Sequence, residues 1–398
     1  MRVPHTPHTF PAFPIYSSAF VSDNQLVLGG GGGVSKSGIK NKLRLFTVKD
    51  DRSVELVDEY ELAKGEDNPM SMAAHPDGKN LVCGVNSALE SLQKGVNENC
   101  RSFSIENGKL SLTRTRGTIS VSDDDDYQKV TVFSPDGTLV AVAGCNTLQV
   151  LSYPSLTPIA SPVQTEKEIY DAAFSKSQLI IATTANLQVY NLPSAEKTKP
   201  SPTKGKKKGK QKSDSSSSVQ LSLDRTIEVP ESLGGSAGNT FRAVRFHPQD
   251  DGILYTALNT IPKRTRSKST PKQAFVCKWN TESWTVAKTR KIGDRSLTCF
   301  TVSPDGKFLG YGSSDLSIGL LDAVTLNPAA SILKAHEFSV TTIAFSPSSK
   351  LLVSGSADYS IRVASIPEVT GSNWGFMMFI LFAILVLFIA FAAQKLLA

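Results

Sequence analysis

The sequence predicts an all-β protein, a seven-bladed WD-type β-propeller followed by a single C-terminal transmembrane α-helix. A hairpin unit that recurs seven times without a helical period indicates the propeller. A long uncharged run near the C-terminus indicates the membrane helix. Together these observations divide the chain into a propeller over residues 1–370, a transmembrane helix over 374–393 and a short lumenal tail over 394–398.

Each repeat is an apolar strand, a turn related to Ser-Pro-Asp-Gly and a second apolar strand that ends in small residues. Proline fixes φ and Asp-Gly completes the turn, so each unit predicts a hairpin. The last two copies continue into Asp315–Ile318 and Asp358–Ile361, and Ala335-His336 stands where WD blades often place Gly-His. Residues 1–10 are the candidate closing strand. The seven copies cover 20–29, 74–84, 133–144, 174–183, 246–257, 302–312 and 345–355.

Three insertions, over 86–100, 193–220 and 259–274, explain the uneven spacing of the repeats. The second is of low complexity, carries eight lysines between Lys197 and Lys212, and is expected to be disordered. Its lysines could bind nucleic acid, serve as a nuclear signal or contact anionic lipid, but we favour a solvated loop. The acidic run Asp123–Asp126 is expected to be a solvated connection, with a basic partner as the alternative.

Residues 374–393 carry no charge, and a helix of that length spans ~30 Å. The N-terminus has no apolar signal region, so we expect a single-pass protein with its propeller in the cytosol. A short span suits the thin endoplasmic reticulum membrane. The five cysteines are scattered without a C-x-x-C pair, which fits a reducing compartment and argues against a zinc site.

Five consecutive glycines, Gly29 to Gly33, precede a strand predicted over 42–48. The run does not form a phosphate loop, because Ser35 stands where that motif needs its second glycine and a strand, not a helix, follows. Two interpretations remain. The run is either a flexible hairpin tip or a rigid loop that presents backbone carbonyls to a partner or to a cation such as K⁺.

Side-chain catalysis is not indicated by this sequence. The five histidines lie in the N-terminal segment or in turn and repeat positions, and each is expected to be structural. No H-E-x-x-H motif is present in the sequence. We therefore expect a protein that is not an enzyme in the covalent sense.

The loop Gly29–Leu43, of the form G-G-G-G…G-I-x-N, combined with a propeller and a C-terminal span, resembles the "Sec twelve" family of endoplasmic reticulum guanine-nucleotide exchange factors. Animal relatives are the prolactin regulatory element-binding proteins. The resemblance implies a factor that promotes GDP release from, and GTP loading of, a Sar-type small GTPase at the endoplasmic reticulum membrane. That step would start COPII coat assembly for ER-to-Golgi transport.

The resemblance also assigns roles to residues of the loop. It implies that potassium is held by the backbone of Gly29, Gly30, Gly31, Gly32 and Gly33, with Asn41 as a further candidate, and that the GTPase is contacted by Gly38, Ile39, Asn41, Leu43 and Pro69. Two alternatives are kept. One is a membrane-anchored scaffold without exchange activity, and the other, which we disfavour, is a nucleic-acid regulator acting through Lys204 to Lys212.

Overall fold

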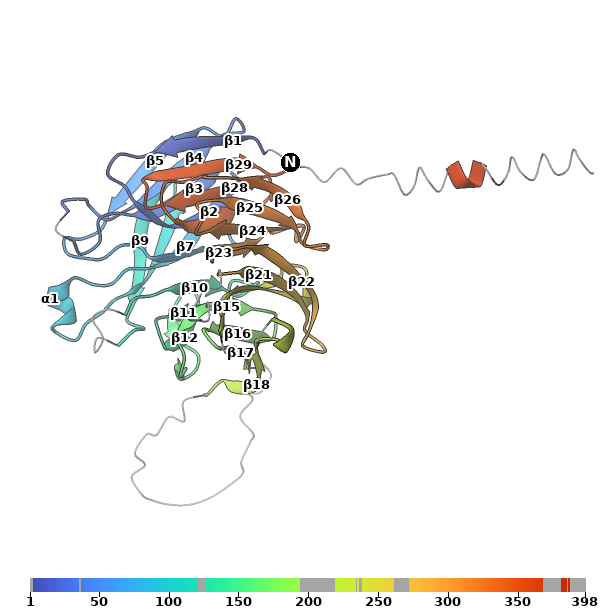
Figure 1. The fold of residues 1–398 in the computed structure, drawn as a ribbon. Coiled ribbons are helices and arrows are strands. Elements are labelled where there is room, and N and C mark those ends of the chain that lie inside the picture. The colour runs from blue at the N-terminus through green and yellow to red at the C-terminus, as the bar shows by residue number, and fades with distance from the viewer. Residues whose placement is uncertain are drawn as a thin grey trace, which may run out of the picture. The chain divides into compact units, whose positions relative to one another are not determined.

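The computed structural model describes residues 3–35, 37–120, 126–193, 219–233, 235, 238–260, 272–367, 381–384 and 386. The chain divides into two units, Met1–Ile366 and Pro367–Ala398. The described part of the first unit forms seven antiparallel sheets that neighbour one another as the blades of a propeller (Figure 1). The predicted seven-bladed, all-β architecture is confirmed.

The blades are numbered here from the N-terminal side, and each has four main strands. Blades 1 and 2 contain β2 (Ile15–Ser22), β3 (Gln25–Gly30), β4 (Lys42–Val48), β5 (Val54–Glu61), and β6 (Ser71–Ala74), β7 (Asn80–Gly84), β8 (Cys100–Glu106), β9 (Lys109–Arg116). Blade 3 contains β10 (Val130–Phe133), β11 (Leu139–Ala143), β12 (Thr147–Ser152), β13 (Thr157–Pro158) and the short β14 (Val163–Gln164). Blade 4 contains β15 (Ile169–Phe174), β16 (Gln178–Thr183), β17 (Asn186–Asn191) and β18 (Ser222–Glu228).

The remaining blades follow the same order. Blades 5 and 6 contain β19 (Asn239–His247), β20 (Asp250–Thr260), β21 (Ala274–Asn280), β22 (Thr285–Gly293), and β23 (Leu297–Val302), β24 (Phe308–Ser313), β25 (Ile318–Asp322), β26 (Pro328–Ile332). Blade 7 contains β27 (Val340–Phe345), β28 (Leu351–Ser356), β29 (Ser360–Ser365) and β1 (His5–Thr9). The short helices are α1 (Leu89–Leu92) and the 3-10 helix η2 (Glu231–Leu233).

All seven predicted turns join the first and second strands of a blade. The turn of blade 3 shows how the motif works. The Ser134 hydroxyl donates to Asp136 Oδ1 over 2.6 Å, and the same oxygen accepts the Thr138 amide over 3.1 Å. The hydrogen bond from Ser134 holds the pKa of Asp136 below its usual range. The Ser-Pro-Asp-Gly sequence therefore satisfies its own polar groups at the tip of each such hairpin.

The core lies between neighbouring blades. Phe13 and Ile15 of blade 1 pack with Val353 and Ile361 of blade 7, and all four are fully buried. Burying one such side chain stabilises the fold by roughly 1.5–3 kcal/mol. Because successive side chains of a strand point to opposite faces of its sheet, each strand packs side chains against both neighbouring blades. The blades are therefore held by face-to-face contacts.

The predicted closing strand is confirmed. In β1 the residues from His5 to Thr9 pair antiparallel with the residues from Ala364 to Ser360 in β29, so the N-terminal segment completes the last blade (Figure 1). Pro7 lies in this edge strand, where a missing amide donor is tolerated. The ring is thus closed by pairing between the two ends of the first unit.

His336, which precedes the first strand of blade 7, is hydrogen-bonded to two later residues of that blade. His336 is buried, with Nε2 2.8 Å from Ser354 Oγ and Nδ1 3.2 Å from Asp358 Oδ2. Burial lowers the pKa of His336, although Asp358 acts against that shift. The expectation of a structural role for His336 is met by these contacts.

Of the predicted transmembrane helix, the structure describes only residues 381–384 and 386, which are helical. Among the described residues, no helix has both the length and the apolarity to cross a membrane. The rest of 374–393 and the predicted tail 394–398 lie outside the described residues. The same holds for most of the lysine-rich insertion, at 194–218, and for Asp123 to Asp125 of the acidic run.

Candidate functional site: the glycine-rich loop of blade 1

The glycine-rich loop covers residues 31–41 and connects β3 to β4. Gly29 and Gly30 do not belong to the loop, because they end β3. Gly29 pairs with Ser17 and Leu43, and Gly30 pairs with Ile15 and Lys42, so both residues lie between two neighbouring strands. Of the five glycines predicted to surround potassium, only Gly31, Gly32 and Gly33 stand outside the sheet.

Close packing explains why the run must be glycine. A Cβ on Gly31, where φ is +144°, would lie 2.2 Å from Asn41 Oδ1, and a Cβ on Gly33, where φ is +66°, would lie 2.9 Å from Asn68 Nδ2. Both positions combine a backbone conformation that side chains disfavour with no room for a side chain. The loop is therefore packed against its surroundings, which favours the rigid interpretation over the flexible hairpin tip.

The buried side-chain amide of Asn41 holds the loop in place through hydrogen bonds. Asn41 Oδ1 accepts the Gly33 amide over 2.8 Å, and Asn41 Nδ2 donates to Gly33 O over 3.1 Å and to Glu66 O over 2.6 Å. The residue is 8% exposed. Its polar atoms are therefore used inside the protein, and it positions the loop instead of presenting itself on the surface.

A second support is the segment between blades 1 and 2, residues 62–70. Its Glu66 carboxylate pairs with Arg101 over 2.6 Å in a largely buried ion pair. The Asp67 amide donates to Asn86 O over 3.0 Å. Losing either partner of the Glu66–Arg101 pair would leave a buried charge uncompensated, which fixes the segment that holds Asn41 and Asn68.

Like Asn41, two further residues predicted to contact the GTPase, Leu43 and Pro69, are buried in this structure. Leu43 is 0% exposed and packs in the cluster with Leu81 and Phe103, so it anchors β4 and has no surface to offer. Pro69 is also buried, and its carbonyl accepts the Ser17 hydroxyl over 2.6 Å. Both residues support the loop from below.

Gly38 and Ile39 do reach the surface. Gly38 is exposed with φ +78°, and a Cβ there would meet nothing within 4 Å. Ile39 is half-buried, and the next residue, Lys40, pairs with Glu61 over 2.6 Å. The outer half of the loop thus carries one half-buried apolar side chain next to a fixed cation.

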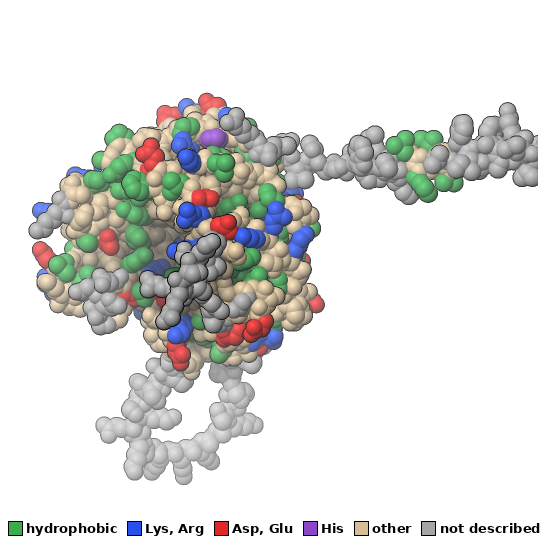
Figure 2. All heavy atoms as spheres, viewed as in Figure 1, with side chains coloured by type: hydrophobic (Ala, Val, Ile, Leu, Met, Phe, Trp, Pro, Cys, Tyr) green, Lys and Arg blue, Asp and Glu red, His purple; other side chains and the backbone are tan. Residues whose placement is uncertain are grey.

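Val34 at the loop tip was not among the predicted site residues. It is 70% exposed and borders a groove of about 640 Å³ whose far side is formed by Ala88 and Leu89 at the start of α1. Leu89 is itself 56% exposed. Figure 2 shows hydrophobic side chains on the side of this face where α1 lies in Figure 1. The only sequence signal was an apolar residue inside the polar stretch between Gly33 and Gly38.

The donors around the loop fit a potassium ion. They include the carbonyl oxygens of Gly31 to Gly33 and the carboxylate of Asp67, which lines the groove beside Val34. A carbonyl that already accepts one hydrogen bond, as Gly33 O does from Asn41, keeps a second lone pair. In the described parts of the chain, no cluster of three His, Cys, Asp or Glu side chains offers a site for a transition metal.

Known proteins match this chain both in its repeat and along most of its length. A family profile described as "WD domain, G-beta repeat" matches residues 328–364. "Guanine nucleotide-exchange factor SEC12" of Rattus norvegicus is 24% identical over 365 residues, which is 81% of this chain and 79% of the rat protein. The protein of that name from Candida glabrata is 27% identical over 183 residues. "SEC12-like protein 1" of Arabidopsis thaliana is 23% identical over 271 residues.

The extent of these matches differs. The Candida glabrata match covers 44% of this chain and 40% of that protein, and the Arabidopsis match covers 67% and 55%. The chain thus spans less than two thirds of these two relatives. The fungal, plant and mammalian relatives nevertheless all carry the name SEC12 or SEC12-like. The family that the glycine-rich loop predicts is confirmed, and this chain is a homologue of the SEC12 guanine nucleotide-exchange factors.

Proposed function

We propose that this protein is a guanine-nucleotide exchange factor for a Sar-type small GTPase, and that the glycine-rich loop is its working part. The observation that carries the proposal is a loop that is fixed from within by Asn41 yet presents Val34 and Ile39 outward. The names of the relatives support exchange activity. The propeller holds the loop still, and the loop binds the partner.

Exchange requires a surface that binds the nucleotide-free GTPase better than the GDP-bound form. Val34 and Ile39 offer an apolar anchor, and the groove beside α1 offers room for an apolar side chain of the partner. A thousandfold acceleration of GDP release needs ~4 kcal/mol off the barrier, which two buried apolar anchors and a few hydrogen bonds can supply. Because the loop is ordered beforehand, little of that energy is lost in fixing it.

Potassium is part of the proposal. When bound, the ion would add a fixed positive centre that draws the loop carbonyls together. Gly31, Gly32 and Gly33 would hold it through their carbonyls, with Asp67 beside them. Asn41 keeps the same backbone in place through Gly33, so the side chain and the ion would act on one segment.

The cellular setting is proposed from the sequence. The uncharged run 374–393 would anchor the protein in the endoplasmic reticulum membrane as a single span, with the propeller in the cytosol and 394–398 as a lumenal tail. GTPase loaded there would be released beside the bilayer where COPII coats assemble for ER-to-Golgi transport. Nucleic acid is not a proposed partner.

The test is release of fluorescent GDP from a Sar-type GTPase in potassium buffer, with residues 1–367 added because they contain every blade. We expect fast release with the wild-type propeller and at least a tenfold loss with Val34→Asp, since burying an unpaired carboxylate costs several kcal/mol. Val324→Asp is the matched control, because Val324 is 68% exposed on a turn of blade 6.

Two outcomes would count against the proposal. No acceleration by a folded wild-type propeller would exclude exchange and leave a scaffold that binds partners without releasing nucleotide. Equal losses with Val34→Asp and Val324→Asp would remove the loop from the mechanism even if exchange occurs.

A further inference from the structure

A polar cavity of about 660 Å³ lies at the mouth of the central channel. Every blade contributes to it from the first half of its first strand or from the residue just before that strand. The contributing residues, in chain order, include Tyr16, Met70, Lys129, Glu168, Arg242, Thr298 and Thr341. The cavity opens at the same end of the ring as the glycine-rich loop, because Ile15, next to Tyr16, pairs with Gly30 at the base of that loop. It is nevertheless a separate site, since none of the described loop residues, 31–35 and 37–41, lines it.

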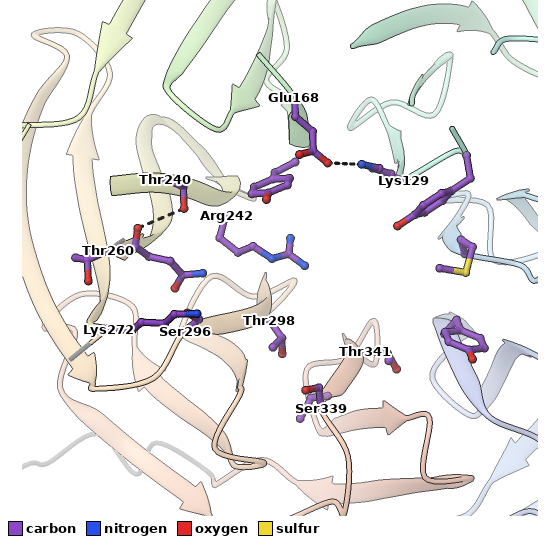
Figure 3. A pocket seen from close by; sticks show the side chains of 16 residues that line it. Lys129, Glu168, Thr240, Arg242, Thr260, Lys272, Ser296, Thr298, Ser339 and Thr341 are labelled. Atoms are coloured by element: carbon purple, nitrogen blue, oxygen red, sulfur yellow. Dashed lines mark hydrogen bonds and ion pairs between the residues drawn. The ribbon is translucent and has the colours of Figure 1, made fainter. Parts of the chain in front are cut away.

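The charges of this cavity are not balanced. Lys129 forms an ion pair with Glu168, which is drawn in Figure 3. Burial would lower the pKa of Lys129, but the hydrogen bonds to Glu168 and Cys145 outweigh it and the pKa is raised. Arg242 and Lys272 also line the cavity, and among the described residues no carboxylate lies within ion-pair distance of either. Within the described part of the chain, two positive charges therefore have no carboxylate partner at the mouth.

Arg242 is aimed into this space. Figure 3 shows its guanidinium projecting into the middle of the cavity. Arg242 Cζ lies 5.6 Å from the centre of the Tyr170 ring, a contact that steadies an arginine without neutralising its charge. Deeper in the channel, the next arginine, Arg245, is paired with Asp171 and is not available. The cations for which the described residues offer no carboxylate partner, Arg242 and Lys272, therefore lie at the mouth of the channel and not deeper inside it.

The rest of the lining suits a ligand rich in oxygen. Hydroxyl groups of Thr260, Ser296, Thr298 and Ser339 line the same cavity as Arg242 and Lys272. The hydroxyls of Thr240 and Thr341 also line it but already donate to backbone carbonyls. A guanidinium fork binds phosphate through two parallel hydrogen bonds, and hydroxyls can donate to the remaining oxygens. A volume of this size holds a small molecule, not a folded segment.

We propose that the mouth of the central channel binds a small phosphate-bearing molecule through Arg242 and Lys272, on the same face as the glycine-rich loop. The ligand carries at least two negative charges, and its phosphate oxygens accept two hydrogen bonds from the Arg242 guanidinium. This site would exist whether or not the protein has exchange activity.

The test is isothermal titration calorimetry of the full chain in mild detergent with inorganic pyrophosphate, at constant ionic strength. We expect saturable binding, weakened about tenfold or more by Arg242→Gln and by Lys272→Gln, since a hydrogen bond to a charged group contributes about 1.5–3 kcal/mol. Arg114→Gln and Lys288→Gln are the matched controls, because both residues are exposed on outer strands β9 and β22. Arg242→Lys keeps the charge but not the fork, and is expected to restore only part of the affinity.

Thermal unfolding of each variant shows whether it is folded, so a loss of binding with an unchanged melting temperature belongs to the site. Absence of binding at millimolar pyrophosphate would overturn the proposal. Equal weakening by the two control variants would also overturn it, because the binding would then be general surface attraction. Binding of a short poly-glutamate peptide that depends on Arg242, without binding of pyrophosphate, would replace the phosphate ligand with an acidic protein segment.

Discussion

Single residues decide whether the loop of blade 1 is a fixed surface. Gly31 and Gly33 permit the backbone to pass close to Asn41 and Asn68, and the Asn41 amide then ties Gly33 to the carbonyl of Glu66. None of these groups needs to touch a partner. Their contribution is geometric, so their loss should affect activity much more than global stability.

Gly31→Ala is predicted to lower exchange at least tenfold, because its Cβ would meet Asn41 Oδ1 at 2.2 Å and the loop would have to move away from its clasp. Gly95→Ala, between α1 and β8, is the control. It has a positive φ of +78° but open space, so it bears only backbone strain of about 1 kcal/mol and is expected to stay within about threefold of wild type. GDP-release rates measure both variants. Equal effects would mean that backbone strain alone, not the contact with Asn41, accounts for the loss.

His336 is predicted to make the propeller less stable as the pH falls from 7 to 5. Burial lowers its pKa in the folded state, so the unfolded chain takes up a proton in this range that the folded chain refuses. The free energy of unfolding should therefore decrease on acidification, by at most about 1.4 kcal/mol per pH unit from one proton. Urea unfolding at several pH values should show a shallower dependence for His336→Gln.

Burial acts to raise the pKa of Asp358, but hydrogen bonds from Ser360 and Glu337 outweigh it, so the pKa is lowered. Carboxylates of this kind lose their stabilising effect only at lower pH. The window from pH 7 to 5 therefore separates them from the histidine. Identical slopes for the wild type and His336→Gln would show that His336 is not the titrating group.

At the scale of elements, the loop 31–41 and the segment 62–70 behave as one unit built on two blades. Asn41 O accepts the Leu62 amide over 2.9 Å, Asn41 Nδ2 reaches Glu66, and Glu66 is held by Arg101 of β8. The groove beside α1 is bordered by both parts. A change in blade 2 can therefore alter a surface that belongs to blade 1.

Replacement of potassium by N-methylglucamine is predicted to slow exchange at least tenfold while the melting temperature of the propeller stays the same, because the proposed ion orders only the loop. Hydrogen exchange at the Gly33 amide, which is bonded to Asn41 and Asn68, should become faster in the same buffer. If neither the rate of GDP release nor the rate of hydrogen exchange at Gly33 changes, potassium has no part in the proposed function. A fall in melting temperature would instead assign the ion to the fold as a whole.

At the scale of the whole molecule, the ring depends on its closure. Blade 7 takes three strands from the end of the first unit and one from its beginning, so β1 covers an edge that β29 would otherwise expose. Phe10 continues this closure by donating its amide to Tyr359 O over 2.8 Å. An open propeller would present an unpaired strand edge to other chains.

Deletion of residues 1–9 is predicted to lower the free energy of unfolding by about 3 kcal/mol or more, because several ladder hydrogen bonds are each worth about 1 kcal/mol. Urea unfolding measures this, and the deleted protein should also associate at high concentration. Pro7→Ala, which keeps the strand and its pairing with Arg362, is the control and should be close to wild type. Unaltered stability after deletion would show that closure by β1 is dispensable.

The sequence predicted the fold because its signals are local. Each Ser-Pro-Asp-Gly turn lies between the two strands it joins, so the seven hairpins could be placed from residues a few positions apart. Burial at the site depends on distant partners. Leu43 is covered by Phe103, and Pro69 is held by Ser17, and neither contact leaves a trace in the loop sequence. Helix α1 has only four residues, too few to show a period.

The pairing of β1 with β29 also orders events during synthesis. Thr9 meets Ser360, so the first strand made must wait for the last one, and at 5–20 residues per second that delay is on the order of tens of seconds. Until then β1 has no partner strand in the nascent chain, and the ring of blades is not closed. The pairing can form only once β29, which ends at Ser365, has been made and is free to meet β1. The topology therefore predicts that the β29 side of the last blade is open to pairing with other chains until β1 has joined it.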